Sequence, residues 1–179
     1  SGLVAAAVSA VLAAGCTLSV GDCLGADQFA LAAAWACRPQ LHRLRVSAVG
    51  GVSGAGFWSH SVPVEVLLKF SRAGYFVHWF AGGHNGVPFR ARLLKRSLAA
   101  LSGAVAAVFF LSSPSSAGSF KVAVAAAKYG ARVSAFCCGF EDPPDPIDFR
   151  GEWLPATSPA ELPPGVTFWR WSPGQKELL

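Results

Sequence analysis

The feature that most constrains this chain is a regular alternation of short apolar runs with longer segments of helical character. The clearest apolar run is "AVAAVFFL" (104–111), which is typical of a buried strand. Four more runs have the same apolar, β-branched composition: "CTLSV" (16–20), "RLRVSAV" (43–49), "YFVHWF" (75–80) and "ARVSAFCC" (131–138). We therefore expect five core strands, with "GGVSGAG" (50–56) as a glycine-rich loop.

Helical segments lie between these strands and end at glycine or proline. They are expected over residues 3–14, 26–37, 63–73, 89–101 and 120–129. A parallel pair of strands needs a crossover connection, so this alternation predicts an α/β fold with a parallel sheet and helices on both faces. Ligands of such folds bind at the carboxyl ends of the strands, in the loops that enter helices.

The composition changes after Gly139. Eight of the twelve prolines fall within residues 143–173, together with Trp153, Trp169 and Trp171. We therefore divide the chain into a domain of residues 1–138 and a Pro/Trp-rich extension of residues 139–179 that wraps it, with "VTFWRW" (166–171) as an added edge strand.

The bulk composition excludes a disordered chain, because 53% of the residues are hydrophobic and only 14% are charged. A net charge of +5 suits an anionic small molecule or a nucleic acid, or serves solubility alone. The apolar N-terminus, "LVAAAVSAVLAAGC" (3–16), resembles a signal-peptide core but lacks a basic segment before it. We interpret it as the first helix of the domain and expect a cytoplasmic protein without a membrane partner.

The first candidate site is "VGDCLGAD" (20–27), between a strand and a helix. Gly21 and Gly25 permit tight turns and a close approach of the backbone to a ligand. The N–H groups at the start of the next helix face the loop, which favours an anion. Asp27 can cap that helix or accept a hydrogen bond from a ribose hydroxyl, and Asp22 can do the same. A capped turn without any ligand is the alternative.

The second candidate site is "SSPSSAGSF" (112–120), after the strongest strand. Ser115, Ser116, Gly118 and Ser119 precede a helix and offer hydroxyl and N–H groups to a phosphate. The loop lacks the GxxxxGK[ST] pattern of a Walker loop. Simple N-capping by serine is the alternative.

A third element, "HNGVPFRARLLKRS" (84–97), places Arg90 in the first turn of a helix, where it can hold a phosphate through two hydrogen bonds. Arg92, Lys95 and Arg96 are expected to face solvent.

The order of these elements resembles the SLOG superfamily, which has Rossmann-like members such as DNA-processing protein A and the "lonely guy" phosphoribohydrolases. The resemblance rests on "GDCLGAD" (21–27), "GVPFRARLL" (86–94) and "SSAGS" (115–119), and covers residues 3–138. It implies a Rossmann-like sheet and a nucleotide-derived ligand.

The chain departs from the family in four places. The Gly-Thr of the last loop is Gly118-Ser119 here, which preserves the hydroxyl. Family members begin with a strand and a Gly-Ser-Arg loop, whereas this chain begins at the helix. Arg90 is followed by alanine where the family has asparagine. The hydrolase branch has a glutamate at the position of Val122, and valine cannot transfer protons.

These observations favour a binding module for a nucleotide or a nucleotide-derived phosphate ligand. A repurposed scaffold that self-associates through its tryptophans is the first alternative, and a nucleotide hydrolase using Asp22 or Asp27 is the second. A homo-oligomer and single-stranded nucleic acid are further candidate partners. We expect no cofactor. We also expect no metal site and free thiols, because the five cysteines are odd in number and have no CxxC spacing.

Overall fold

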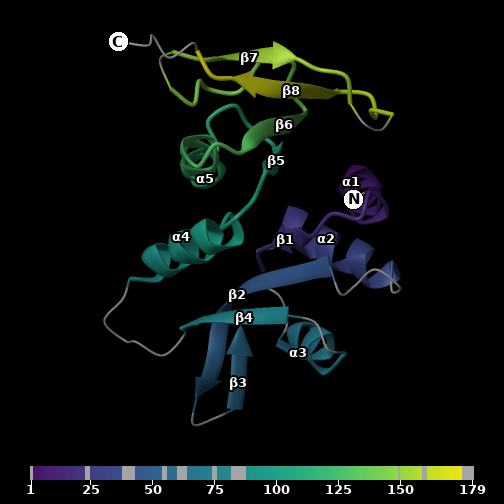
Figure 1. The fold of residues 1–179 in the computed structure, drawn as a ribbon, viewed down its shortest axis with the longest axis vertical. Helices are drawn as coiled ribbons and strands as arrows, with labels where there is room; N and C mark the ends of the chain where they lie inside the picture. The colour runs from purple at the N-terminus through teal and green to yellow at the C-terminus, as the bar shows by residue number, and fades with distance from the viewer. Residues whose placement is uncertain are drawn as a thin grey trace. The chain divides into compact units, whose positions relative to one another are not determined.

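The computed structural model of the 179-residue chain describes residues 2–22, 25–37, 43–53, 56–59, 64–73, 76–81, 88–148, 150–158 and 161–174. It divides into two compact units, residues 1–102 and 103–179. Within the described residues it is a mixed α/β protein with five helices and two four-stranded sheets (Figure 1).

The first unit contains four of the helices and four strands. In chain order they are α1 (Gly2–Ala13), β1 (Leu18–Val20), α2 (Ala26–Ala36), β2 (Leu44–Ser53), β3 (Gly56–Ser59), α3 (Val64–Arg72), β4 (Phe76–Ala81) and α4 (Phe89–Ala100). Strand β2 lies between its partners: β1 and β4 pair with it in parallel on either side, and β3 pairs with it antiparallel. This sheet is therefore mostly parallel, as the alternation of strands and helices predicts.

The second unit contains β5 (Ala106–Leu111), α5 (Ala117–Lys128), β6 (Arg132–Cys138), β7 (Glu152–Pro155) and β8 (Val166–Ser172). Its strand order is β5-β6-β8-β7, with β5 and β6 parallel and the other two pairs antiparallel. The boundary expected at residue 138 stays a prediction. In the structure, β6 before that point and β8 after it belong to one sheet.

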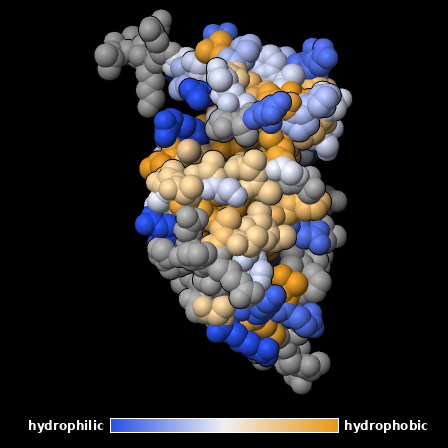
Figure 2. Space-filling view, turned by 90° about the vertical axis from the view of Figure 1, so that its right-hand side faces the viewer, coloured by the Kyte–Doolittle hydropathy of each residue, from blue (hydrophilic) through white to orange (hydrophobic). Residues whose placement is uncertain are grey.

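The N-terminal helix is confirmed. Val4, Val8 and Leu12 are buried, at the i, i+4 spacing of one helix face. The opposite face is alanine-rich and includes the exposed Ala6 and Ala10. Figure 2 shows that weakly hydrophobic residues cover much of one face of the molecule. Within the described residues, no helix combines the length and the apolar character that a bilayer crossing requires.

Two expectations about strands are wrong. Residues 50–56 are not simply a loop, because β2 continues to Ser53 and pairs with β3, Gly50 opposite Ser59 and Ser53 opposite Gly56. A ladder uses backbone groups, which glycines also have, so a glycine-rich run can still be a strand.

The second wrong expectation concerns the edge of the other sheet. Strand β8 is an inner strand, because β6 and β7 hydrogen-bond to its two sides, and β7 forms the edge. The four residues of β7 include Pro155, which is typical of an edge strand.

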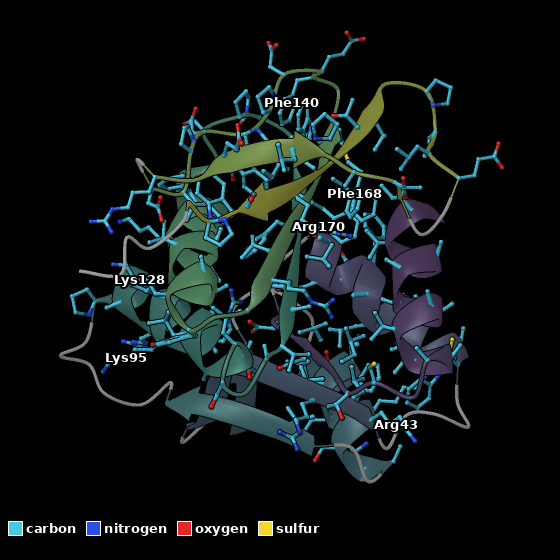
Figure 3. All side chains as sticks on the ribbon, turned by 45° about the horizontal axis from the view of Figure 1, so that its top comes forward. Arg43, Lys95, Lys128, Phe140, Phe168 and Arg170 are labelled. Atoms are coloured by element: carbon cyan, nitrogen blue, oxygen red, sulfur yellow. The ribbon has the colours of Figure 1, made fainter. Side chains whose placement is uncertain are left out.

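The core of the second unit lies on both faces of its sheet. On one face, Leu111, Ala135 and Cys137 form a buried cluster against which Phe140 packs (Figure 3). On the other face, Phe136 packs between Phe110 and Phe168, with ring centroids 5.1 and 4.4 Å away.

Candidate functional site

The loop after β1 enters α2 through Gly25, the N-cap residue. Its φ of +96° lies in the region that residues with a side chain rarely adopt, so glycine is required there by the backbone. Cys23 and Leu24 of the predicted motif lie outside the described residues.

Asp22 is fully buried and both of its carboxylate oxygens have partners inside the fold. Oδ1 forms an ion pair with Nη1 of Arg96, and Oδ2 accepts a hydrogen bond from the backbone N–H of Val49 at 3.0 Å. A buried carboxylate without such partners would be strongly destabilising. This environment favours a positioning role for Asp22 over direct contact with a ligand.

The expectation that Arg96 faces solvent is wrong, because only 5% of this residue is exposed. Its Nη2 also donates a hydrogen bond to Ser97 Oγ at 3.2 Å. Lys95 beside it is exposed (Figure 3), as predicted, and Arg92 is half-buried. Arg96 lies on the buried side of α4, where the carboxylate of Asp22 offsets the cost of removing its charge from water. The sequence signal was an acidic residue two positions after a strand, because a carboxylate that becomes buried there needs a cation.

Asp27 and Arg96 converge on Gly21. A Cβ atom at Gly21 would lie 2.5 Å from Oδ2 of Asp27 and 3.1 Å from Cζ of Arg96. A side chain at this position would therefore displace the carboxylate of Asp27 or the guanidinium of Arg96. The site holds two carboxylates and one guanidinium, an arrangement that suits hydroxyl donors better than a phosphate.

Arg90 lies in the first turn of α4, as predicted, after the N-cap residue Pro88. Its side chain is outside the described part of the structure, so its contact with a phosphate stays a prediction.

The serine-rich loop follows β5 in the second unit, and α5 begins at Ala117, three residues earlier than expected. Gly118 and Ser119 therefore belong to the first turn of the helix. Ser116 is the N-cap residue, and its hydroxyl makes no capping hydrogen bond. The Phe120 N–H bonds to Ser116 O at 2.8 Å, whereas the three preceding N–H groups have no partner within the helix by its geometry.

The accessible part of this loop is its outer side. Ser115 and Gly118 are exposed, and Ser119 is half-buried. Beneath the loop, a narrow apolar cavity of about 10 Å³ is lined by residues that include Ser116, Phe120 and Trp153. That volume is room for one water at most, so a ligand of this loop must bind from outside.

The two loops belong to different compact units, so each stands as a site by itself. Within the described residues, no group of three or more His, Cys, Asp or Glu side chains could hold a metal ion. The four cysteines of that part, Cys16, Cys37, Cys137 and Cys138, are free thiols, as predicted.

Comparison of the chain with protein-family models, with curated proteins and with solved structures finds no match.

Proposed function

We propose that this protein is a binding module for a nucleotide-derived ligand, and that Ser115, Ser116, Gly118 and Ser119 receive a phosphate of that ligand. The observation that carries the proposal is the start of α5, where the hydroxyl of Ser116 leaves the first N–H groups uncapped. Anions bind at helix N-termini because these N–H groups and the helix dipole favour negative charge.

The position of the loop in its sheet supports the proposal. It follows the carboxyl end of β5, whose neighbour β6 runs parallel to it. In α/β proteins this edge of a parallel sheet is where ligands bind. A Rossmann-like arrangement and the resemblance to the SLOG superfamily are part of this proposal, and they extend it from phosphate to nucleotide.

The loop after β1 belongs to the other compact unit, and we propose it as a separate site for a ligand that carries hydroxyl groups. The carboxylate of Asp27, half-exposed at the start of α2, can accept hydrogen bonds from hydroxyl groups such as those of a ribose. The buried pair of Asp22 and Arg96 then holds the loop in place for Asp27.

The test is calorimetric titration with AMP, ADP, ADP-ribose and inorganic phosphate, using wild type, Gly118→Asp and Gly118→Asn. A Cβ atom at Gly118 would meet no atom within 4 Å, so both variants fit the fold. We expect the aspartate to weaken binding about tenfold through charge repulsion at close range. The asparagine has nearly the same shape and should change affinity little.

Equal losses in the two Gly118 variants would indicate steric blocking only and would remove the argument for a phosphate. No binding of any of these compounds to the wild type would overturn the proposed function.

A second candidate is an interaction protein that associates through the start of β5. Val105, directly before β5, and Val108, within it, are 76% and 46% exposed, which is unusual for so apolar a segment of the chain. Among the described residues, β5 pairs with β6 alone, so its other side offers backbone groups for pairing.

A further inference from the structure

A segment of the C-terminal extension is hydrogen-bonded to the serine-rich loop. The backbone N–H of Asp145 donates to the carbonyl of Pro114 at 3.3 Å. The indole N–H of Trp153 in turn donates to the carbonyl of Asp145 at 3.0 Å. Trp153, Asp145 and Pro114 thus form one chain of contacts from strand β7 to the loop, which we call the brace.

The brace starts from a rigid part of the sheet. Trp153 lies opposite Trp171 of β8, and their rings contact edge to face with centroids 5.4 Å apart. Trp153 also packs against the buried cluster of Leu111, Ala135 and Cys137. Because these neighbours belong to strands, the indole N–H is held in one position.

The chain between the two ends of the brace is also constrained. Oδ1 of Asp148 accepts hydrogen bonds from the N–H groups of Arg150 and Gly151, at 2.8 and 3.0 Å. A Cβ atom at Gly151 would lie 2.3 Å from Cζ2 of Trp171, so only glycine fits where the chain returns to β7. Pro144, next to Asp145, is buried.

We propose that the brace positions the serine-rich loop for its ligand, and that Trp153 is the positioning residue, although it lies far along the sequence from the loop. This proposal rests on the proposed function for the ligand, while the ordering of the loop follows from the contacts alone. The Pro114 carbonyl precedes Ser115 and Ser116 directly, so its fixation limits the conformations of both serines. The C-terminal extension, residues 139–179, therefore contributes to the site by ordering its loop.

The experiment compares Trp153→Phe with Trp169→Phe. Both changes keep an aromatic ring and remove one indole N–H bond, but that of Trp169 goes to Thr167 Oγ1 at 3.0 Å and does not reach the loop. We measure hydrogen exchange of residues 115–119 without ligand, and affinity for ADP by calorimetry. The tryptophan fluorescence change that ADP causes is the third readout.

We expect Trp153→Phe to raise exchange in the loop and to weaken ADP binding about fivefold, the value of one hydrogen bond. The fluorescence change should be reduced or lost in Trp153→Phe and kept in Trp169→Phe, which should also match the wild type in exchange and affinity. A second pair of variants tests the brace without changing a tryptophan. Asp145→Pro removes the backbone N–H that bonds to Pro114, and Asp145→Ala keeps this N–H as the matched control.

Unchanged exchange in Trp153→Phe and Asp145→Pro would overturn the brace itself. Raised exchange with unchanged ADP affinity would overturn its role in ligand binding. Raised exchange in a protein whose wild type binds no ADP would instead count against the proposed function, and would reduce the brace to a structural contact.

Discussion

The residue that contributes most to the first unit's candidate site is Arg96, and it does so from inside the fold. Its guanidinium pairs with Asp22, and the carboxylate of Asp22 also accepts a hydrogen bond from the N–H of Val49 in the middle of β2. The ion pair of Arg96 and Asp22 therefore connects α4, the loop after β1 and the central strand β2.

Removal of either charge alone should be costly. We expect Arg96→Met to destabilise the protein by about 3–5 kcal/mol, because Asp22 would keep a buried charge without its cation. The double variant Asp22→Asn, Arg96→Met should recover a large part of that loss. Urea unfolding of the two single variants and the double variant forms a thermodynamic cycle. Additive effects would show that the pair is not coupled.

Cys137 is a residue whose environment suppresses its reactivity. Burial raises the pKa of its thiol from 9.0 to about 11, while a hydrogen bond with Thr167 opposes this shift and the neighbouring Cys138 adds slightly to it. The thiolate is the reactive form, so at pH 8 Cys137 should react with a disulfide reagent far more slowly than the exposed Cys16.

The same shift predicts a pH dependence of stability. The unfolded chain ionises Cys137 near pH 9 and the folded chain near pH 11, so the contribution of this thiol is complete below pH 9 and is lost as the pH rises to 11. A Cys137→Ala variant should show a smaller loss of stability over this interval. Labelling of Cys137 at the rate of Cys16 at pH 8 would contradict the assignment.

At the scale of elements, the positions of helices and strands follow from local chemistry, whereas their partners do not. The five helices lie where apolar spacing, glycine and proline predict them, with shifts of at most three residues at their ends. The role of β8 as an inner strand depends on β7, a four-residue strand with too few residues to show a pattern. The start of α5 at Ala117 also moved Gly118 and Ser119 from a loop into a helix turn.

At the scale of the whole molecule, the exposed valines at the start of β5 and within it distinguish the two candidate functions. Val105 directly precedes β5 and Val108 lies in the middle of it, whereas the serine-rich loop follows the other end of the strand. A six-residue strand is about 20 Å long, so changes at Val105 should act independently of the loop. We expect Val105→Lys, Val108→Lys to sediment as a monomer and to bind ADP like the wild type. An oligomeric wild type whose dispersal abolishes binding would favour the interaction protein.

The sequence by itself determined the α/β class, the order of the elements and the position of both candidate loops, because periodicity, glycine and proline act over a few neighbouring residues. Only the tertiary structure decided that Arg96 is the buried partner of Asp22 and that the carboxylate of Asp27 lies close to Gly21. It also decided that Trp153 is connected to the serine-rich loop through Asp145. These contacts join residues far apart in the chain, and the free energy that selects them comes from burial and charge pairing across elements. No local pattern contains that information.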